Sequence, residues 1–228
     1  MLAIWKKEFV QSFKSVFSIV TIAIFTAVSY YLSDFIAKNG AMLGKEVAEE
    51  GYVGGLVLLI YLFGFLFMFS LFHDTINREL ESRTIRFLVT KTSRLSIVLG
   101  KFLGIFTYWF VCLLVSFGIV ATFAEKFYFK SFGHLLVMLL YMVSMCLLLS
   151  SLIPRRSMSM FTGLLVGLAI PVFGLWSQFS DKAWLKIIKY ATPYYYFIDG
   201  GTWGWAVVLL MAAVMLGGSI LLLQRRDL

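Results

Sequence analysis

The stretch INRELESRTIRFLVTKTSR, residues 76–94, carries seven charged side chains. On either side of it, residues 52–72 and 102–124 contain no Asp, Glu, Lys or Arg. Each flanking segment is long enough for a helix to cross a bilayer, which takes about 20 apolar residues. We therefore predict that the charged stretch connects two membrane spans.

The composition supports this reading for the whole chain. Its residues are 61% hydrophobic and only 14% charged, whereas soluble proteins carry about 25% charged residues. Six uncharged apolar segments are predicted to span as helices, because lipid offers free backbone groups no partners; they lie near 16–33, 52–72, 102–124, 132–153, 158–178 and 202–223. We predict an all-α integral membrane protein with one transmembrane domain over residues 1–228.

Basic residues are divided unequally between the connectors. The N-terminus, the loop 73–101, the turn at 154–157 and the C-terminal tail hold 13 Lys and Arg, and the other connectors hold 7. By the positive-inside rule the first set faces the cytoplasm, so both termini are predicted to lie there, in a multi-pass protein of the plasma membrane. The net charge of +8 is then a topology signal, and nucleic acid is not an expected partner.

Residues 1–14, MLAIWKKEFVQSFK, are predicted to form a helix in the cytoplasmic membrane interface. Leu2, Trp5, Phe9 and Phe13 recur at helical spacing and would face the acyl chains, with lysines among the headgroups. The alternative is a frayed start to the first span. On the outer side, residues 34–51 carry charges of both signs with three glycines and are predicted to form a solvated loop.

Residues 182–197 are predicted to form a short helix in the outer interface, followed by a turn into the sixth span. Lys182, Lys186 and Lys189 are spaced four and three residues apart, which places them on one helical face. Pro193 ends the helix, and Tyr194 follows at the headgroup level, where tyrosine is enriched. The element is a candidate gate; an aromatic belt alone is the other explanation of its tyrosines.

The sequence contains no HExxH, CxxC or GxSxG motif. Its nearest approach to a P-loop, GAMLGKE at 40–46, has three residues instead of four between its glycines, and Glu46 stands where a Ser or Thr must meet Mg²⁺. We expect no catalytic residue, metal site or cofactor on this chain. Because the spans contain no charged relay group either, the energy for uphill transport is expected to come from another subunit.

The charged stretch itself is predicted to form one helix over about 75–88. Ile76, Leu80, Thr84 and Phe87 with Leu88 would line an apolar stripe against the spans, and the charged residues would cover the rest of the circumference. Glu79 and Arg83 would form an i,i+4 ion pair there. Taken alone, this pattern also fits a merely solvated face.

The order of residues in this region resembles the signature of type-2 ABC exporter permeases, the membrane subunits of ATP-binding-cassette transporters. In that family a Glu-rich segment after span two leads to a Thr, a short apolar run, a basic residue and then Gly-Lys; here these are Glu79, Thr84, residues 85–89, Arg94 and LGK at 99–101. Two departures are Arg83, where a Gly usually precedes the Thr, and the missing Pro before Arg94. The six spans and the two interfacial helices also match the family.

The resemblance implies that the charged stretch is a coupling helix, which docks in a groove of a cytoplasmic ATPase subunit that holds ATP and Mg²⁺. Its implied contacts with that subunit are Arg78, Glu79, Glu81, Arg83, Thr84 and Arg86. The resemblance also implies a second permease, either another copy or a paralogue. The small residues Ser159, Gly163 and Gly167 of the fifth span are a candidate dimer contact or, equally, a contact within the chain.

The expected cargo is amphipathic or lipophilic, because the spans offer aromatic and aliphatic side chains rather than charge. Within that class we favour a peptide toxin or an antimicrobial peptide, on the resemblance to small family members. The competing function is a stand-alone channel, or a membrane anchor that recruits a cytoplasmic partner.

Overall fold

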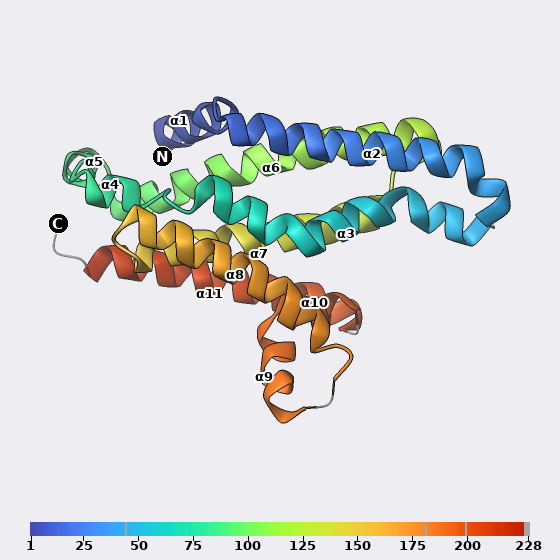
Figure 1. Ribbon diagram of the computed structural model, residues 1–228. Coiled ribbons are helices and arrows are strands. Elements are labelled where there is room, and N and C mark those ends of the chain that lie inside the picture. The colour runs from blue at the N-terminus through green and yellow to red at the C-terminus, as the bar shows by residue number, and fades with distance from the viewer. Residues whose placement is uncertain (44, 181, 199, 226–228) are drawn as a thin grey trace.

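The structure is a computed structural model that describes residues 1–43, 45–180, 182–198 and 200–225. The described chain is helical throughout and contains no strand, which confirms the all-α prediction (Figure 1). Its elements are α1 Leu2–Phe13, α2 Val16–Leu43, α3 Lys45–Phe72, α4 Asn77–Glu81, α5 Ile85–Lys91, α6 Arg94–Ala124, α7 Phe129–Leu152, α8 Arg156–Trp176, α9 Ala183–Ala191, α10 Pro193–Ile198, the 3-10 helix η1 Gly201–Trp203 and α11 Gly204–Arg225.

Six of these helices are long and apolar enough to cross a membrane: α2, α3, α6, α7, α8 and α11. Each contains most of one predicted span, so the chain is a multi-pass membrane protein. The predicted loop 34–51 was wrong, because α2 continues to Leu43 and α3 begins at Lys45. Gly40 and Gly51 thus lie within these helices, and Gly44 lies outside the described residues.

The spans pack around α7. Of the six, α7 buries the largest share of its apolar stretch, 67%, and α11 the smallest, 22%. α7 contacts α11, α6 and α3, while α2 and α8 pack on α3. The largest fully buried side chains include Tyr108, Trp109 and Phe117 of α6, Tyr141 of α7 and Phe65 of α3.

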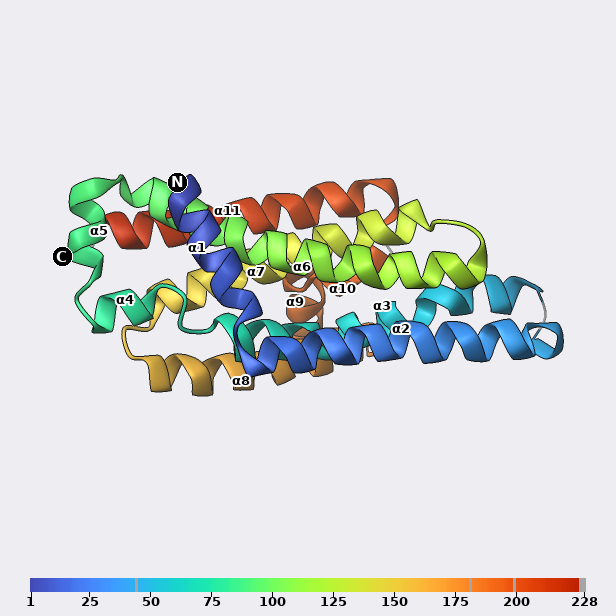
Figure 2. The ribbon, with the colours of Figure 1, turned by 90° about the horizontal axis from the view of Figure 1, so that it is seen from above.

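The N-terminus, α4, α5 and the C-terminal end of α11 gather at one end of the bundle (Figures 1 and 2), which we call the connector end. The helical hairpin between α2 and α3 forms the far end. α9 projects from the side of the bundle near α10 (Figure 1).

The stripe Ser159, Gly163 and Gly167 lies between α8 and α3 of the same chain. A Cβ at Gly163 would meet Phe69 Cβ at 3.2 Å, and one at Gly167 would meet Leu66 Cα at 3.2 Å. Ser159 Oγ donates to the carbonyl of His73 at 2.7 Å. These residues serve a contact within the chain, which is one of the two alternatives that the sequence left open.

Gly167→Leu tests this packing. The new side chain would press on the backbone of α3, and overpacking of this kind costs about 1–3 kcal/mol, so the unfolding temperature in detergent should fall by roughly 5 °C. Gly118→Leu is the matched control, because a Cβ at Gly118 meets nothing within 4 Å. An equal effect of both substitutions on the unfolding temperature would contradict the contact.

Candidate functional site

The charged stretch forms two short helices, not the single helix predicted over 75–88. α4 ends at Glu81 and α5 begins at Ile85. Between them Arg83 has φ +57°, in the left-handed region, where a right-handed helix cannot continue. The chain therefore turns at Arg83, and the predicted stripe from Ile76 to Thr84 is interrupted.

The N-terminal end of α4 is held by α7. The backbone N–H groups of Ile76 and Asn77 both donate to Ser150 Oγ, at 2.9 and 3.3 Å. All three residues are fully buried. Ser150 thus supplies, from another span, the acceptor that a capping side chain would otherwise give to the free N–H groups at a helix start.

A buried cation ties α4 to two more helices. The side chain of Lys101, at the start of α6, has no exposed surface. Its ammonium donates to the Thr75 carbonyl at 2.7 Å and to Glu8 Oε1 at 2.8 Å, and lies 3.1 Å from Glu79 Oε1. These acceptors satisfy all three N–H donors of a lysine. We call Lys101, Glu8, Glu79 and the Thr75 carbonyl the Lys101 cluster.

The Lys101 cluster corrects the prediction for Glu79. The sequence placed this carboxylate on the outward face, paired with Arg83, but it is only 6% exposed and faces Lys101. No ion pair joins Glu79 to Arg83 within the described part of the chain. Since removing one partner of a buried ion pair costs about 3–5 kcal/mol, the cluster fixes how its three segments meet.

α1 reaches this cluster by packing across α6 (Figure 2). Its backbone comes close because two α6 glycines lie beneath it: a Cβ at Gly100 would meet Ile4 Cβ at 3.0 Å, and one at Gly104 would meet Glu8 Cβ at 2.7 Å. Trp5 Nε1 donates to Thr107 Oγ1 at 3.0 Å. The apolar stripe of α1 thus packs partly against α6, where the sequence predicted that it would face lipid.

Further ion pairs surround the Lys101 cluster at longer distances. Arg78 lies 3.5 Å from Glu8 Oε2, and Lys7 lies 3.8 Å from Glu79 Oε1. On the α8 side, Arg156 lies 3.9 Å from Asp74 and 3.7 Å from Glu81. The side chains of Arg156 and Glu81 are 45% and 50% exposed, so this pair contributes about 0–1 kcal/mol.

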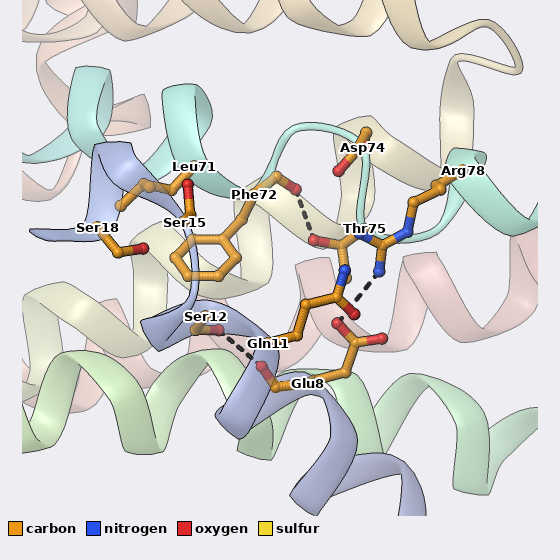
Figure 3. Close-up of a pocket in the computed structure, with 10 residues that line it drawn as sticks. All are labelled: Glu8, Gln11, Ser12, Ser15, Ser18, Leu71, Phe72, Asp74, Thr75 and Arg78. Carbon is orange, nitrogen blue, oxygen red and sulfur yellow. Dashed lines mark hydrogen bonds and ion pairs between the residues drawn. The ribbon is translucent and has the colours of Figure 1, made fainter.

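A polar cavity of about 210 Å³ lies beside the cluster, between α1, the start of α2 and the junction of α3 with α4 (Figure 3). Its lining residues are Glu8, Gln11, Ser12, Ser15, Ser18, Leu71, Phe72, Asp74, Thr75 and Arg78. The Ser18 hydroxyl is buried and has no hydrogen-bond partner among the described residues. The connector end is thus polar inside as well as on its surface.

α5 presents the outward face of the charged stretch. Ile85 is buried and anchors it, while Phe87 is 74% exposed. Beside α5, a groove of about 530 Å³ runs to α1 and α4 and is lined by Lys7, Gln11, Arg78, Glu79, Ser82, Thr84, Phe87 and Leu88. Of the predicted contact residues, Glu81, Arg83, Thr84 and Arg86 are exposed and Arg78 is partly so. Phe87 was predicted on the stripe that rests on the bundle, and this is wrong, because the turn at Arg83 gives α5 a different orientation.

The sequence was compared with models of known protein families. A family model described as ABC-2 family transporter protein matches residues 33–223. The chain belongs to the ABC-2 transporter family. A comparison with curated proteins finds no match. ABC-2 proteins of this kind are membrane components of ABC transporters and imply a partner ATPase subunit, which confirms the resemblance to type-2 ABC permeases.

In this ABC-2 chain the Gly-Lys pair at 100–101 has a structural explanation. Gly100 lets the backbone of α1 approach α6, since the Met1 carbonyl lies 3.1 Å from where a Cβ would be. Lys101 then joins α1 to the segment before α4 and to α4 itself. The sequence could have pointed to Lys101 and Glu8: Glu8 is the one acidic residue among the lysines of residues 1–14.

Arg94, the basic residue of the resemblance, binds the C-terminal end of α11. Its guanidinium donates to the Leu223 carbonyl at 2.9 Å and to that of Gln224. Cations are favourable at helix C-termini, where carbonyls lack intrahelical partners. Arg94 thereby fixes the last span of the permease at the connector end.

The element predicted over 182–197 is formed by α9 and α10. Lys182 precedes α9, Lys186 is exposed, and Lys189 Nζ lies 4.8 Å from the centre of the Tyr195 ring. Thr192 is extended, and Pro193 begins α10. A proline is tolerated at this first helical position because its missing N–H has no partner to lose.

Tyr194 was predicted at headgroup level, and the structure shows that its side chain packs inside the bundle. It is fully buried between α3 and α8. Its hydroxyl donates to the Tyr61 carbonyl at 2.7 Å, and its ring fills the space above Gly174, where a Cβ would lie 2.5 Å from Tyr194 Cδ2. Burial raises the pKa of Tyr194, so this phenol stays protonated and donating.

The described residues contain no group of three or more His, Cys, Asp or Glu side chains able to hold a metal ion. His73 follows the end of α3, Cys112 lies on α6, and His134 and Cys146 lie twelve residues apart on α7. The site offers charged and aromatic surfaces for a protein partner, and its polar chemistry is that of ion pairs and hydrogen bonds.

Arg83→Gly tests the left-handed turn. A non-glycine residue with this conformation costs about 1–2 kcal/mol, so glycine should raise the unfolding temperature of the purified permease by roughly 3 °C. Arg83→Val should lower it, because a β-branched residue suits positive φ least. Arg83→Ala controls for the lost charge. If the valine variant were the most stable of the three, the turn would differ from the one described.

Proposed function

We propose that this ABC-2 permease subunit exports an amphipathic or lipophilic cargo, using ATP hydrolysed by a separate ATPase subunit that docks on α5 and the adjoining groove. Both termini would then lie in the cytoplasm, on the same side as the ATPase. The exposure of α5 at the connector end is the observation that carries the docking site. A second copy or a paralogue would complete the transporter.

The chemistry of α5 suits a protein partner. An exposed aromatic ring flanked by arginines is the composition typical of the residues that dominate interface energies. Phe87 supplies the ring, with Arg86 next to it and Arg83 at the turn. We expect an apolar recess edged with acidic residues on the ATPase, because charge complementarity steers docking and fixes its register.

The cargo proposal draws on an apolar groove between α2 and α3. Its volume is about 520 Å³, and its lining contains no charged residue: Ala27, Val28, Tyr31, Leu32, Gly55, Leu58, Leu59 and Phe63. Such a surface suits the apolar part of a cargo and offers nothing to a small hydrophilic ion. Within this class we favour an amphipathic peptide, such as a toxin or an antimicrobial peptide.

Phe87→Ser combined with Arg86→Glu should abolish co-elution of the permease with its ATPase. Removing the ring and reversing a neighbouring charge should weaken the complex by about 100-fold, as loss of a central aromatic anchor does. The measurement is the amount of untagged ATPase retained by tagged permease in detergent. Phe129→Ser is the matched control, because Phe129 is 77% exposed but lies on α7, away from α4 and α5. Unchanged retention by the double variant would refute the docking site.

The direction of transport can be measured in inverted membrane vesicles that contain the permease and its ATPase. ATP added outside should drive uptake of a fluorescent amphipathic peptide, because the cytoplasmic face is then outermost. A hydrophilic peptide of equal length should not accumulate, since the α2–α3 groove offers it no polar partner. ATP-dependent loss of preloaded peptide from the same vesicles would show import and overturn the export proposal.

A further inference from the structure

α4 is attached to its neighbours in two different ways. Toward α1 and α6 the attachment is the Lys101 cluster, which is ionic and buried. Toward α7 and α8 it consists of neutral hydrogen bonds and of ion pairs on the surface. This difference decides which neighbours α4 can leave when a partner pulls or pushes on α5.

On the α1 and α6 side, separation would strand a charge. Lys101 has no exposed surface, and the segment 75–79 supplies two of its three partners, the Thr75 carbonyl and Glu79. Moving α4 away from α6 would leave Glu8 as the only partner of the ammonium, because the Thr75 carbonyl and the Glu79 carboxylate would move away with α4. Glu8 in turn lies on α1 and also pairs with Arg78, so α1 is bound to α4 by the same charges.

On the α7 side, the contact is neutral and incompletely satisfied. The Ser150 hydroxyl accepts two N–H groups from α4. The neighbouring Asn77 side chain is fully buried, yet neither its nitrogen nor its oxygen has a hydrogen-bond partner within the described residues. A buried amide without partners disfavours the present arrangement, so solvating it would offset part of the cost of breaking the two hydrogen bonds to Ser150.

The polar cavity leaves room for such a movement. It separates α1 and the start of α2 from the α3–α4 junction (Figure 3), and it is lined by hydroxyl groups that water can solvate. The cavity therefore lies where α1 and α4 would tilt relative to the ends of α2 and α3.

We infer that α1, α4 and the start of α6 stay together as one unit during transport and that α4 separates from α7, with Lys101 as the positioning residue that holds the unit together. The inference rests on the proposed function in one respect, namely that the ATPase docked on α5 drives the movement. It is independent of the cargo and of the direction of transport.

Two disulfides with opposite expected effects test this unit, in a background with Cys112→Ala and Cys146→Ala. Asn77→Cys with Ser150→Cys links α4 to α7, where the Asn77 backbone nitrogen lies 3.3 Å from Ser150 Oγ. Ile4→Cys with Gly100→Cys links α1 to α6, where the Cβ positions are 3.0 Å apart, close to the about 3.8 Å of a disulfide. Oxidation of the first pair should lower the permease-dependent ATPase activity of the reconstituted complex by about 10-fold or more, because it blocks a required separation.

Oxidation of the second pair should change that ATPase activity less than about 2-fold, because its ends move together within one unit. Reduction with dithiothreitol should restore both variants, which separates the crosslink from the substitutions. An oxidised α4–α7 link that leaves the activity intact, or an oxidised α1–α6 link that abolishes it, would overturn the inference.

A second measurement needs no ATPase and so distinguishes failure of the unit from failure of the proposed function. Lys101→Met alone should lower the unfolding temperature of the permease by roughly 10 °C, because it leaves two buried carboxylates without their cation. Adding Glu8→Gln and Glu79→Gln should restore much of this loss. If the three substitutions were simply additive, no ionic cluster would join α1, α4 and α6. If instead wild-type permease never activates an ATPase while this rescue is seen, the proposed function fails and the cluster stands.

Discussion

One lysine, Lys101 of α6, constrains the connector end of this protein. Desolvating an ammonium costs several kcal/mol, and the side chain of Lys101 has no exposed surface to offset that cost. It is stable there because α1, the segment before α4, and α4 itself each present an oxygen within 3.1 Å. The positions of these three segments are therefore set by what a single cation requires. Gly104 follows from the same requirement, because a Cβ there would lie 2.7 Å from Glu8 Cβ, and a larger residue would hold Glu8 too far from Lys101.

The concentration of charge in residues 76–94 now has two explanations, one for each side of the turn at Arg83. Before the turn, charges of α4 and its approach face other helices: Glu79 meets Lys101, Arg78 meets Glu8, and Glu81 meets Arg156. After the turn, Arg86 and Phe87 face outward and have no such internal role. If this segment transmits force from a partner subunit, as proposed, it needs a part fixed to the other helices and a part exposed to the partner. An exposed surface that was held loosely would move without moving the spans. Arg83, with its positive φ, separates the ion-paired α4 from the exposed α5.

Periodicity was enough to predict the six spans, because a run of about 20 apolar residues has few alternatives in a membrane. It was not enough for the connector. A helical wheel drawn over 75–88 assumes an unbroken helix, and it counts every charged residue as facing water. Arg83 breaks the first assumption by adopting positive φ without being glycine, and Glu79 breaks the second, because its partner lies on another span. The same limit applies to Gly163, Gly167 and Tyr194: small residues and tyrosine are typical of interfaces and headgroups, and only the fold shows that α3 already occupies the space beside them.

The predicted spans contain no Asp, Glu, Lys or Arg, whereas charge is buried at the connector end, and both features concern how force reaches the spans. Such residues are the ones that usually couple a carrier to an ion gradient, so their absence from the predicted spans agrees with the proposal that a partner ATPase supplies the work of transport. α5 is where a partner can reach, and α4 follows directly from α3. Near its middle α3 is held by Tyr194, whose hydroxyl donates to the Tyr61 carbonyl, and closer to α4 it packs on the glycines of α8. A force on α5 therefore meets a fixed ionic joint at Lys101 and a neutral, dispensable one at Ser150. The weaker joint breaks first, so α4 separates from α7 while α1 and the start of α6 move with α4.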